Sequence, residues 1–136
     1  MIRPICRDCM ILSRKSTLAI KDDLPVMLDL LDTLEANAEC CVGMAANMIG
    51  INKRIIVFSA GILHIPMINP AITARSGAYE AEEGCLSLEG VRKTTRFQSI
   101  TVEYLDRGFK KQRQSFSGWT AQIIQHEIDH CDGILI

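Results

Sequence analysis

The sequence has little of what marks several classes of protein. Its 15 Lys and Arg residues against 16 Asp and Glu residues give a net charge of −1, so no basic excess favours nucleic acid or an anionic membrane as a partner. Its apolar runs, such as 55–58 and 61–63, are far shorter than the ~20 residues that span a bilayer. The opening MIRPICRDCM has no apolar h-region of the kind found in secretory signals. We therefore expect a cytoplasmic protein that binds neither nucleic acid nor membrane.

The chain also lacks internal repeats, low-complexity tracts and a recognisable linker. Its 136 residues, 48% apolar and 23% charged, are enough to form one globular domain over 1–136 with a buried core. Cys6 and Cys9 form a C-x-x-C, but no second such pair completes a four-thiolate zinc site, and no strand-then-helix context marks a redox motif. We interpret these two cysteines as incidental reduced thiols.

Two segments have the pattern of helices. Residues 24–39 carry apolar side chains at three- and four-residue spacing, with Pro25 in the first turn, where its missing N–H costs little. The apolar positions of this stripe are Leu24, Met27, Leu28, Leu31 and Leu34. The second helix is predicted from Trp119 to about His130, with Gly133 as its stop signal. Its apolar face is formed by Ile123, Ile124 and Ile128.

Strand signals lie between these helices. Residues 54–59 (RIIVFS) read as a buried strand, and the prolines that bracket MIN at 66–70 suggest a short strand at an edge. Residues 99–106 and 109–117 alternate around the DRG turn and predict a β-hairpin. Strands in the middle with helices at both ends predict an α+β fold, mostly antiparallel, packed around the C-terminal helix.

The most informative stretch is QHEIDH at 125–130. Positions i and i+4 of a helix share one face, so His126 and His130 can reach a single metal ion, whereas Glu127 points about a quarter-turn away and suits the role of a base. Catalytic sites of this kind use three protein ligands and leave a position for water. From the residues alone the third ligand is His64, a carboxylate or a cysteine. Among the cysteines, Cys85 follows a glycine in EEGCLS.

Three motifs, in order along the chain, make the sequence resemble the peptide deformylase family. GMAANMIG at 43–50 is similar to the family's G-x-G-L-A-A-x-Q-x-G, EGCLS at 83–87 is identical to its second motif, and QHEIDH is identical to the core of its third. The resemblance implies a hydrolase that removes the N-formyl group from the terminal methionine of nascent polypeptides. Its partners would be these formylated peptides, met at the ribosome.

The resemblance also implies roles for individual residues. The metal ligands would be Cys85, His126 and His130, holding one divalent ion, Fe²⁺ by preference and Zn²⁺ or Ni²⁺ in purified protein. Glu127 would be the general acid and base, with the backbone N–H of Leu86 donating to the oxyanion. Substrate contacts carried over from the family fall on Val42, Gly43, Gly84, Leu86, Arg92 and Ile123.

Two departures from the first motif bear on activity. Met48 stands where the family has a glutamine whose side-chain N–H serves the oxyanion, and a thioether cannot donate. Cys41 replaces the motif's first glycine and is expected to crowd the peptide groove. Two readings remain: a deformylase with activity reduced by Met48, and a deformylase-like paralogue that binds metal and peptide with little turnover. A third, an unrelated H-E-x-x-H peptidase, is disfavoured by EGCLS.

Overall fold

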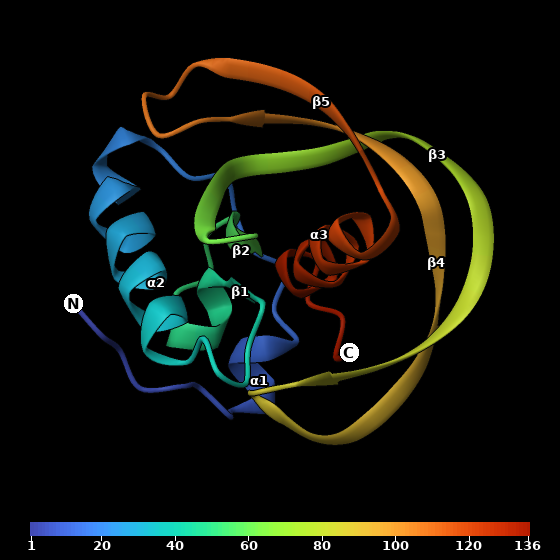
Figure 1. Cartoon of the computed structure of the whole chain (residues 1–136). Coiled ribbons are helices and arrows are strands. Elements are labelled where there is room, and N and C mark those ends of the chain that lie inside the picture. Colours follow the sequence, from blue (N-terminus) through green and yellow to red (C-terminus); the bar gives the residue numbers. More distant parts are fainter.

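The structure, a computed structural model, describes all residues 1–136 and follows the α+β order that the sequence predicts (Figure 1). Helices lie at both ends of the chain, and the part between them is a run of antiparallel strands interrupted by one 3₁₀ helix. The elements are α1 (Cys9–Leu12), the 3₁₀ helix η1 (Lys21–Asp23), α2 (Leu24–Ala36), β1 (Gly43–Ala45), the 3₁₀ helix η2 (Ala46–Ile49), β2 (Ile55–Ala60), β3 (Leu63–Cys85), β4 (Leu88–Leu105), β5 (Lys111–Ser117) and α3 (Gly118–Cys131).

The five strands form one sheet in the order β1-β2-β3-β4-β5, with every neighbour antiparallel. β3 and β4 form a long ribbon that curves around α3, while α2 lies on the other side of β1 and β2 (Figure 1). The far end of the ribbon, where β3 turns into β4, thereby returns to the neighbourhood of α3. This curvature brings the EGCLS motif to the helix that carries QHEIDH.

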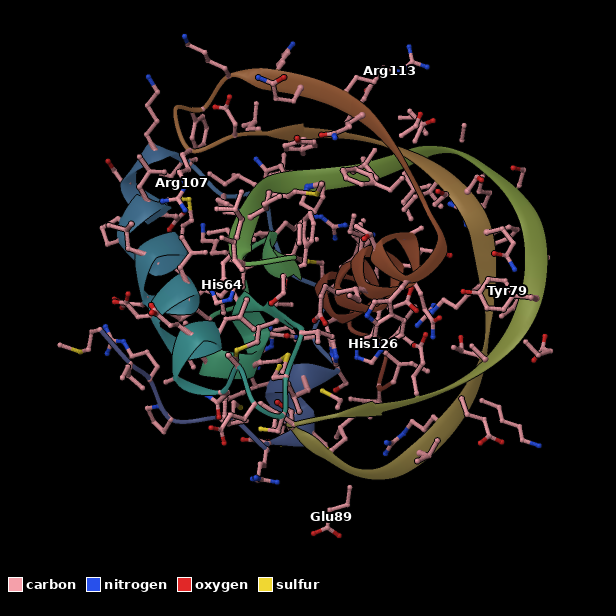
Figure 2. The ribbon with its side chains drawn as sticks, viewed as in Figure 1. His64, Tyr79, Glu89, Arg107, Arg113 and His126 are labelled. Atoms are coloured by element: carbon pink, nitrogen blue, oxygen red, sulfur yellow. The ribbon has the colours of Figure 1, made fainter.

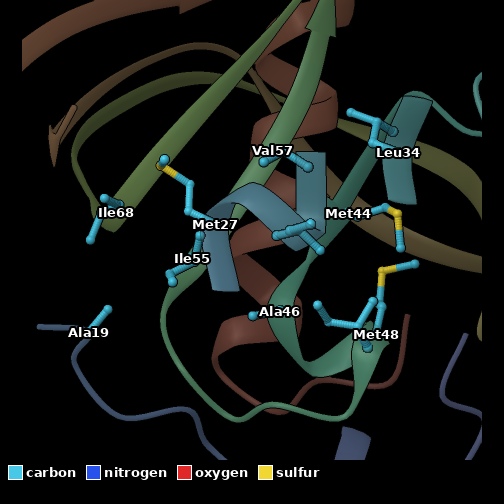
Figure 3. Close-up of a cluster of buried hydrophobic side chains, with 11 residues drawn as sticks. Ala19, Met27, Leu34, Met44, Ala46, Met48, Ile55, Val57 and Ile68 are labelled. Atoms are coloured by element: carbon cyan, nitrogen blue, oxygen red, sulfur yellow. The ribbon is translucent and has the colours of Figure 1, made fainter. Parts of the chain in front are cut away.

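Two hydrophobic clusters meet at β2. Ile55 and Val57 face the cluster that contains α2 and η2, whereas Ile56 and Phe58 face the cluster that contains α3. Because successive side chains of a strand point to opposite faces, a strand buried on both sides must be apolar throughout. Figure 3 shows the first cluster, to which Met44 and Met48 belong. The second cluster fixes α3 through Ile124 and Ile128 against the sheet.

The helix predictions are largely confirmed. α3 spans Gly118–Cys131, and Gly133 follows it with a φ of +76°, as expected of a glycine stop. α2 begins at Leu24 but ends at Ala36, three residues before the predicted end, because Asn37 leaves helical geometry and bonds back to Thr33. The predicted apolar stripe was wrong at Leu28, which is 51% exposed; Leu30 fills that part of the core instead.

The strand predictions were right in place, and those over 66–70 and 99–106 were too short. The 99–117 hairpin is confirmed, with Ser99 opposite Ser117 and Leu105 opposite Lys111. Residues 66–70, expected as a short strand, instead belong to the 23-residue β3. Pro66 is tolerated there because β3 has not yet met β4 at that point; their pairing begins at Ile68. No helix is both long enough and apolar enough to cross a membrane.

Candidate metal centre

His126 and His130 lie one turn apart on the inner face of α3, and both are buried. Their Nε2 atoms are 3.1 Å apart, and the Sγ atom of Cys85, at the end of β3, lies 3.3 Å from Nε2 of His130. The three potential ligand atoms all fall within 4.8 Å of one another. Cys85 precedes the histidines by 40 residues or more in the sequence, and the curved β3–β4 ribbon brings it next to them in space.

Glu83 orients the imidazole of His126. Nδ1 of His126 lies 2.8 Å from Oε1 of Glu83. Burial alone would raise the pKa of Glu83, but hydrogen bonds from His126 and Arg96 outweigh it and lower that pKa to about 2. Burial would lower the pKa of His126, but Glu127, Cys85 and Glu83 raise it to about 10, so the free imidazole is protonated. An ionised carboxylate only accepts, so Nδ1 of His126 donates to Glu83, and a bound cation would displace the proton from Nε2 alone. A carboxylate behind a ligating imidazole is a common support for metal sites.

The imidazole of His130, by contrast, is neutral. Burial and the neighbouring imidazole of His126 lower its pKa, and its Nδ1 is buried without a hydrogen-bond partner. Two imidazole nitrogens and one cysteine sulfur thus converge on one point. This donor set fits a divalent transition-metal ion with one coordination position left for water. We conclude that Cys85, His126 and His130 form a metal site.

Arg96 of β4 connects β3 and α3 through ion pairs. It is 3% exposed, its Nη2 lies 2.6 Å from Oε1 of Glu83, and its Nη1 lies 2.6 Å from Oδ2 of Asp129. Glu83 is on β3, Arg96 on β4 and Asp129 on α3, so one guanidinium joins three elements. Gln122 adds a further bond by donating to Oε2 of Glu83 at 2.9 Å. These bonds hold the carboxylate of Glu83 in place behind His126.

The other ligands left open by the sequence take no part. His64 lies opposite Ser59 near the start of β3 and shares a surface hollow with Leu28 and Leu31 of α2, away from His126 on α3 (Figure 2). Cys6 and Cys9 are free thiols, half-buried and exposed, and belong to no group of three metal-ligating side chains. The cluster of Cys85, His126 and His130 is the only such group.

Glu127 faces the cavity beside the metal site. It is 4% exposed, and its Oε1 has no hydrogen-bond partner. Burial raises the pKa of Glu127 to about 7, despite the opposing effect of His126. A buried carboxylate with a pKa near neutrality can both take and return a proton. Gly43 leaves the room that this carboxylate occupies, since a Cβ there would lie 2.9 Å from Oε2 of Glu127.

The cavity has a volume of about 480 Å³ and lies between β1, the β3–β4 turn and α3. Of the substrate contacts expected from the sequence, Arg92 alone does not line it; its guanidinium donates to the carbonyl of Glu89. The backbone N–H of Leu86 has no partner within the chain. The singled-out residues that line the cavity are Cys41, Val42, Gly43, Met48, Gly84, Cys85, Leu86, Ile123, His126 and Glu127.

Met48 contributes to both the core and the cavity wall. Its side chain is 1% exposed, and its Sδ atom accepts a hydrogen bond from the N–H of Ala45 at 3.5 Å. The neighbouring Asn47 cannot supply a substitute donor, because its Nδ2 bonds the carbonyls of His130 and Leu12. The first motif therefore presents a thioether to the cavity and no side-chain N–H.

Sequence reasoning did not identify several residues of the site. Glu83 could have been found from the sequence, because it lies two residues before Cys85 and strand side chains two apart share a face. Arg96 and Asp129 could not, because their contact depends on the curvature of the β3–β4 ribbon. Trp119 and Gln122, on the first turns of α3, were read only as helix residues, yet both line the cavity.

The chain resembles known proteins along its full length. Residues 6–136 match the family described as Polypeptide deformylase. The peptide deformylase of Clostridium beijerinckii is 58% identical over 136 residues, which is all of both chains. The crystal structure of a peptide deformylase from Legionella pneumophila superposes with a TM-score of 0.88 at 31% identity, covering 99% of this chain and 83% of that one.

A second solved structure carries a peptide. The Met-ala-ser bound class I type b peptide deformylase from Acinetobacter baumannii matches with a TM-score of 0.87 at 28% identity, over 99% of this chain and 97% of that one. The match therefore includes the helix with both histidines, the strand end with Cys85 and the edge strand with Gly43. On the strength of the family match and of this full-length similarity, the chain belongs to the peptide deformylase family.

Proposed function

We propose that this protein is a peptide deformylase, a metallohydrolase that removes the N-formyl group from the formylmethionine at the start of nascent polypeptides. The observation that carries the proposal is the convergence of Cys85, His126 and His130 beside the unpartnered carboxylate of Glu127, at the wall of one cavity. Cys85, His126 and His130 would hold a divalent ion, which would lower the pKa of a water molecule and polarise the formyl oxygen.

Glu127 performs the proton transfers. Its carboxylate accepts a proton as water attacks the formyl carbon, and it then returns the proton to the departing amine nitrogen. The bond between the formyl carbon and that nitrogen breaks, giving formate and a free N-terminus. The N–H of Leu86, which has no partner within the chain, donates to the oxygen on which negative charge develops.

The peptide binds between two backbone segments of the cavity. Gly43 on one wall and Gly84 on the other have no side chains, so an extended chain can approach both and pair as an added strand. Val42, Leu86 and Ile123 provide an apolar surface that suits a methionine side chain. Arg92, outside the cavity wall, contacts only a substrate that extends beyond it.

The metal and the setting of the reaction follow from the same proposal. Ferrous iron is the physiological ion, and zinc or nickel replaces it in purified protein. The substrates are chains emerging from the ribosome in the cytoplasm, and residues 1–136 act as one domain. Mixed nitrogen and sulfur ligands accept all three of these ions, so the donor set is compatible with each.

The decisive experiment measures formate release from formyl-Met-Ala-Ser by protein prepared anaerobically and loaded with Fe²⁺. We expect release that depends on the metal and disappears in Glu127→Ala. Metal stripped by a chelator and then restored should restore activity, which separates loss of metal from loss of fold.

A second candidate function is favoured by Met48. Because a thioether replaces the expected donor, the chain could bind formylated or methionine-led peptides with little turnover. Wild-type protein with one metal ion per chain that binds Met-Ala-Ser yet releases no formate would establish this paralogue function and overturn the first proposal.

A further inference from the structure

β1 forms one edge of the sheet and pairs only with β2. The N–H of Ser59 donates to the carbonyl of Val42 at 2.8 Å, so the backbone groups of Val42 point toward β2. In an antiparallel ladder these directions alternate along the strand. The N–H and C=O of Gly43, opposite Phe58, therefore point to the open edge, on the side of the cavity.

The carbonyl of Gly43 already has a donor. The Sγ atom of Cys41 lies 2.9 Å from it, and Cys41 is half-buried in the cavity wall. Burial raises the pKa of Cys41 to about 12, so the thiol keeps its proton. Among the side chains that can donate, a thiol is one of the weakest. An amide N–H is a stronger donor than a thiol, so one on a bound peptide would compete for the same oxygen.

We propose that the Cys41 thiol is a displaceable cap on the Gly43 carbonyl and thereby sets the affinity of the groove for peptides. When the groove is empty, the cap satisfies an acceptor at a sheet edge, where unpaired groups invite pairing with other chains. When an extended peptide enters, its N–H replaces the thiol. The inference rests on the proposed function, because it assumes that the peptide pairs with β1.

The strength of the donor at position 41 then determines the Michaelis constant. Cys41→Ser places a stronger donor on the Gly43 carbonyl, and KM for formyl-Met-Ala-Ser should rise roughly three- to tenfold, the effect of about one hydrogen bond. Cys41→Ala and Cys41→Gly remove the donor, and KM should fall roughly two- to fivefold. The value of kcat should stay within about twofold in all three variants, because the cap is released before the chemical step.

A binding measurement accompanies the kinetics. Titration calorimetry of Met-Ala-Ser into metal-loaded protein should give dissociation constants in the same order: Cys41→Ser weakest, wild type intermediate, Cys41→Ala and Cys41→Gly tightest. Cys9→Ser and Cys9→Ala serve as matched controls, since Cys9 is exposed on α1 and outside the cavity. Both should bind and react like wild type.

The order of the variants in KM and in dissociation constant tests the inference. Serine and alanine variants that shift KM and the dissociation constant in the same direction, or not at all, would overturn it. So would a change confined to kcat. If the binding order holds while no protein releases formate, the cap stands and the proposed function fails. If formate is released but the order is absent, only the cap fails, and absence of peptide binding by every form removes both.

Discussion

Gly43 of β1 lies directly against Glu127 of α3. A Cβ atom built on Gly43 would be 2.9 Å from Oε2 of Glu127 and 2.8 Å from Cγ2 of Ile123, closer than real side chains approach. Gly43→Ala should therefore push the carboxylate away from the cavity. We expect a loss of about 1–3 kcal/mol in the free energy of unfolding from overpacking, together with a fall in kcat of tenfold or more from the misplaced base.

The control for this substitution is Gly108→Ala. A Cβ there meets only Oδ1 of Asp106, at an ordinary 3.4 Å, in the exposed turn before β5. Urea unfolding and formate release should both be unchanged in that variant. If Gly43→Ala retained wild-type activity, the contact between β1 and α3 would not be what positions Glu127.

Glu127 is expected to be essential for turnover and dispensable for metal binding. Its carboxylate lines the cavity next to the ligand His126, but the convergent atoms belong to Cys85, His126 and His130. Glu127→Ala should lower kcat by about 10²–10⁴, the usual contribution of a general base. The metal content, measured by atomic emission, should stay near one ion per chain. Loss of metal together with activity would assign Glu127 a structural role instead.

Arg96 carries the largest expected effect on stability. Its guanidinium is buried against Glu83 and Asp129, and removing one partner of such a group leaves charges uncompensated. Arg96→Leu should cost about 3–5 kcal/mol in the free energy of unfolding. It should also weaken metal binding, measured by competition with a chromogenic chelator, because Glu83 would no longer be fixed behind His126.

Arg113→Ala is the matched control for Arg96→Leu. Arg113 is exposed on β5 and its side chain extends away from the sheet (Figure 2). Its removal should change the unfolding free energy by no more than about 0.5 kcal/mol. Equal effects of the two substitutions would mean that the buried network does not hold the site.

Two of the three metal ligands could be found in the sequence because their geometry is local. The i, i+4 relation of His126 and His130 follows from helical pitch alone, whereas the assignment of Cys85 depended on the match of EGCLS to the family's motif. Glu83, two residues earlier on the same strand, could have been identified from the sequence as well. By contrast, the meeting of Arg96 with Asp129 requires the β3–β4 ribbon to curve around α3, and sequence periodicity contains no information about curvature.

The ribbon itself escaped prediction for a physical reason. Between residues 71 and 82 of β3 nearly every side chain is exposed or half-buried, so no alternation of apolar and polar residues marks the strand. In β2 both faces are buried, and the run IIVF signalled a strand at once. The stripe on α2 failed at Leu28 because the helix packs through Met27, Leu30 and Leu34, a face that apolar spacing alone did not distinguish.

Met48 is the residue whose replacement should raise activity. Its Sδ atom accepts the N–H of Ala45 at 3.5 Å, and its side chain is part of the cavity wall. Glutamine has a similar length. Its amide oxygen can take over the bond from Ala45, which leaves the amide N–H₂ free to point into the cavity. Met48→Gln thus adds a donor for the formyl oxygen without opening the core.

The added donor acts on the oxygen as negative charge develops, so it should raise kcat more than it changes KM. Deleting one such donor in other hydrolases costs about 10²–10³ in kcat, which bounds the gain; we expect an increase on the order of 10–10³-fold. Met48→Leu, similar in size and without a donor, should leave kcat at or below the wild-type value. Unchanged kinetics in Met48→Gln, with wild-type protein already fast, would show that the N–H of Leu86 and the metal site suffice for the oxyanion. The departure from glutamine at position 48 would then have no consequence for catalysis.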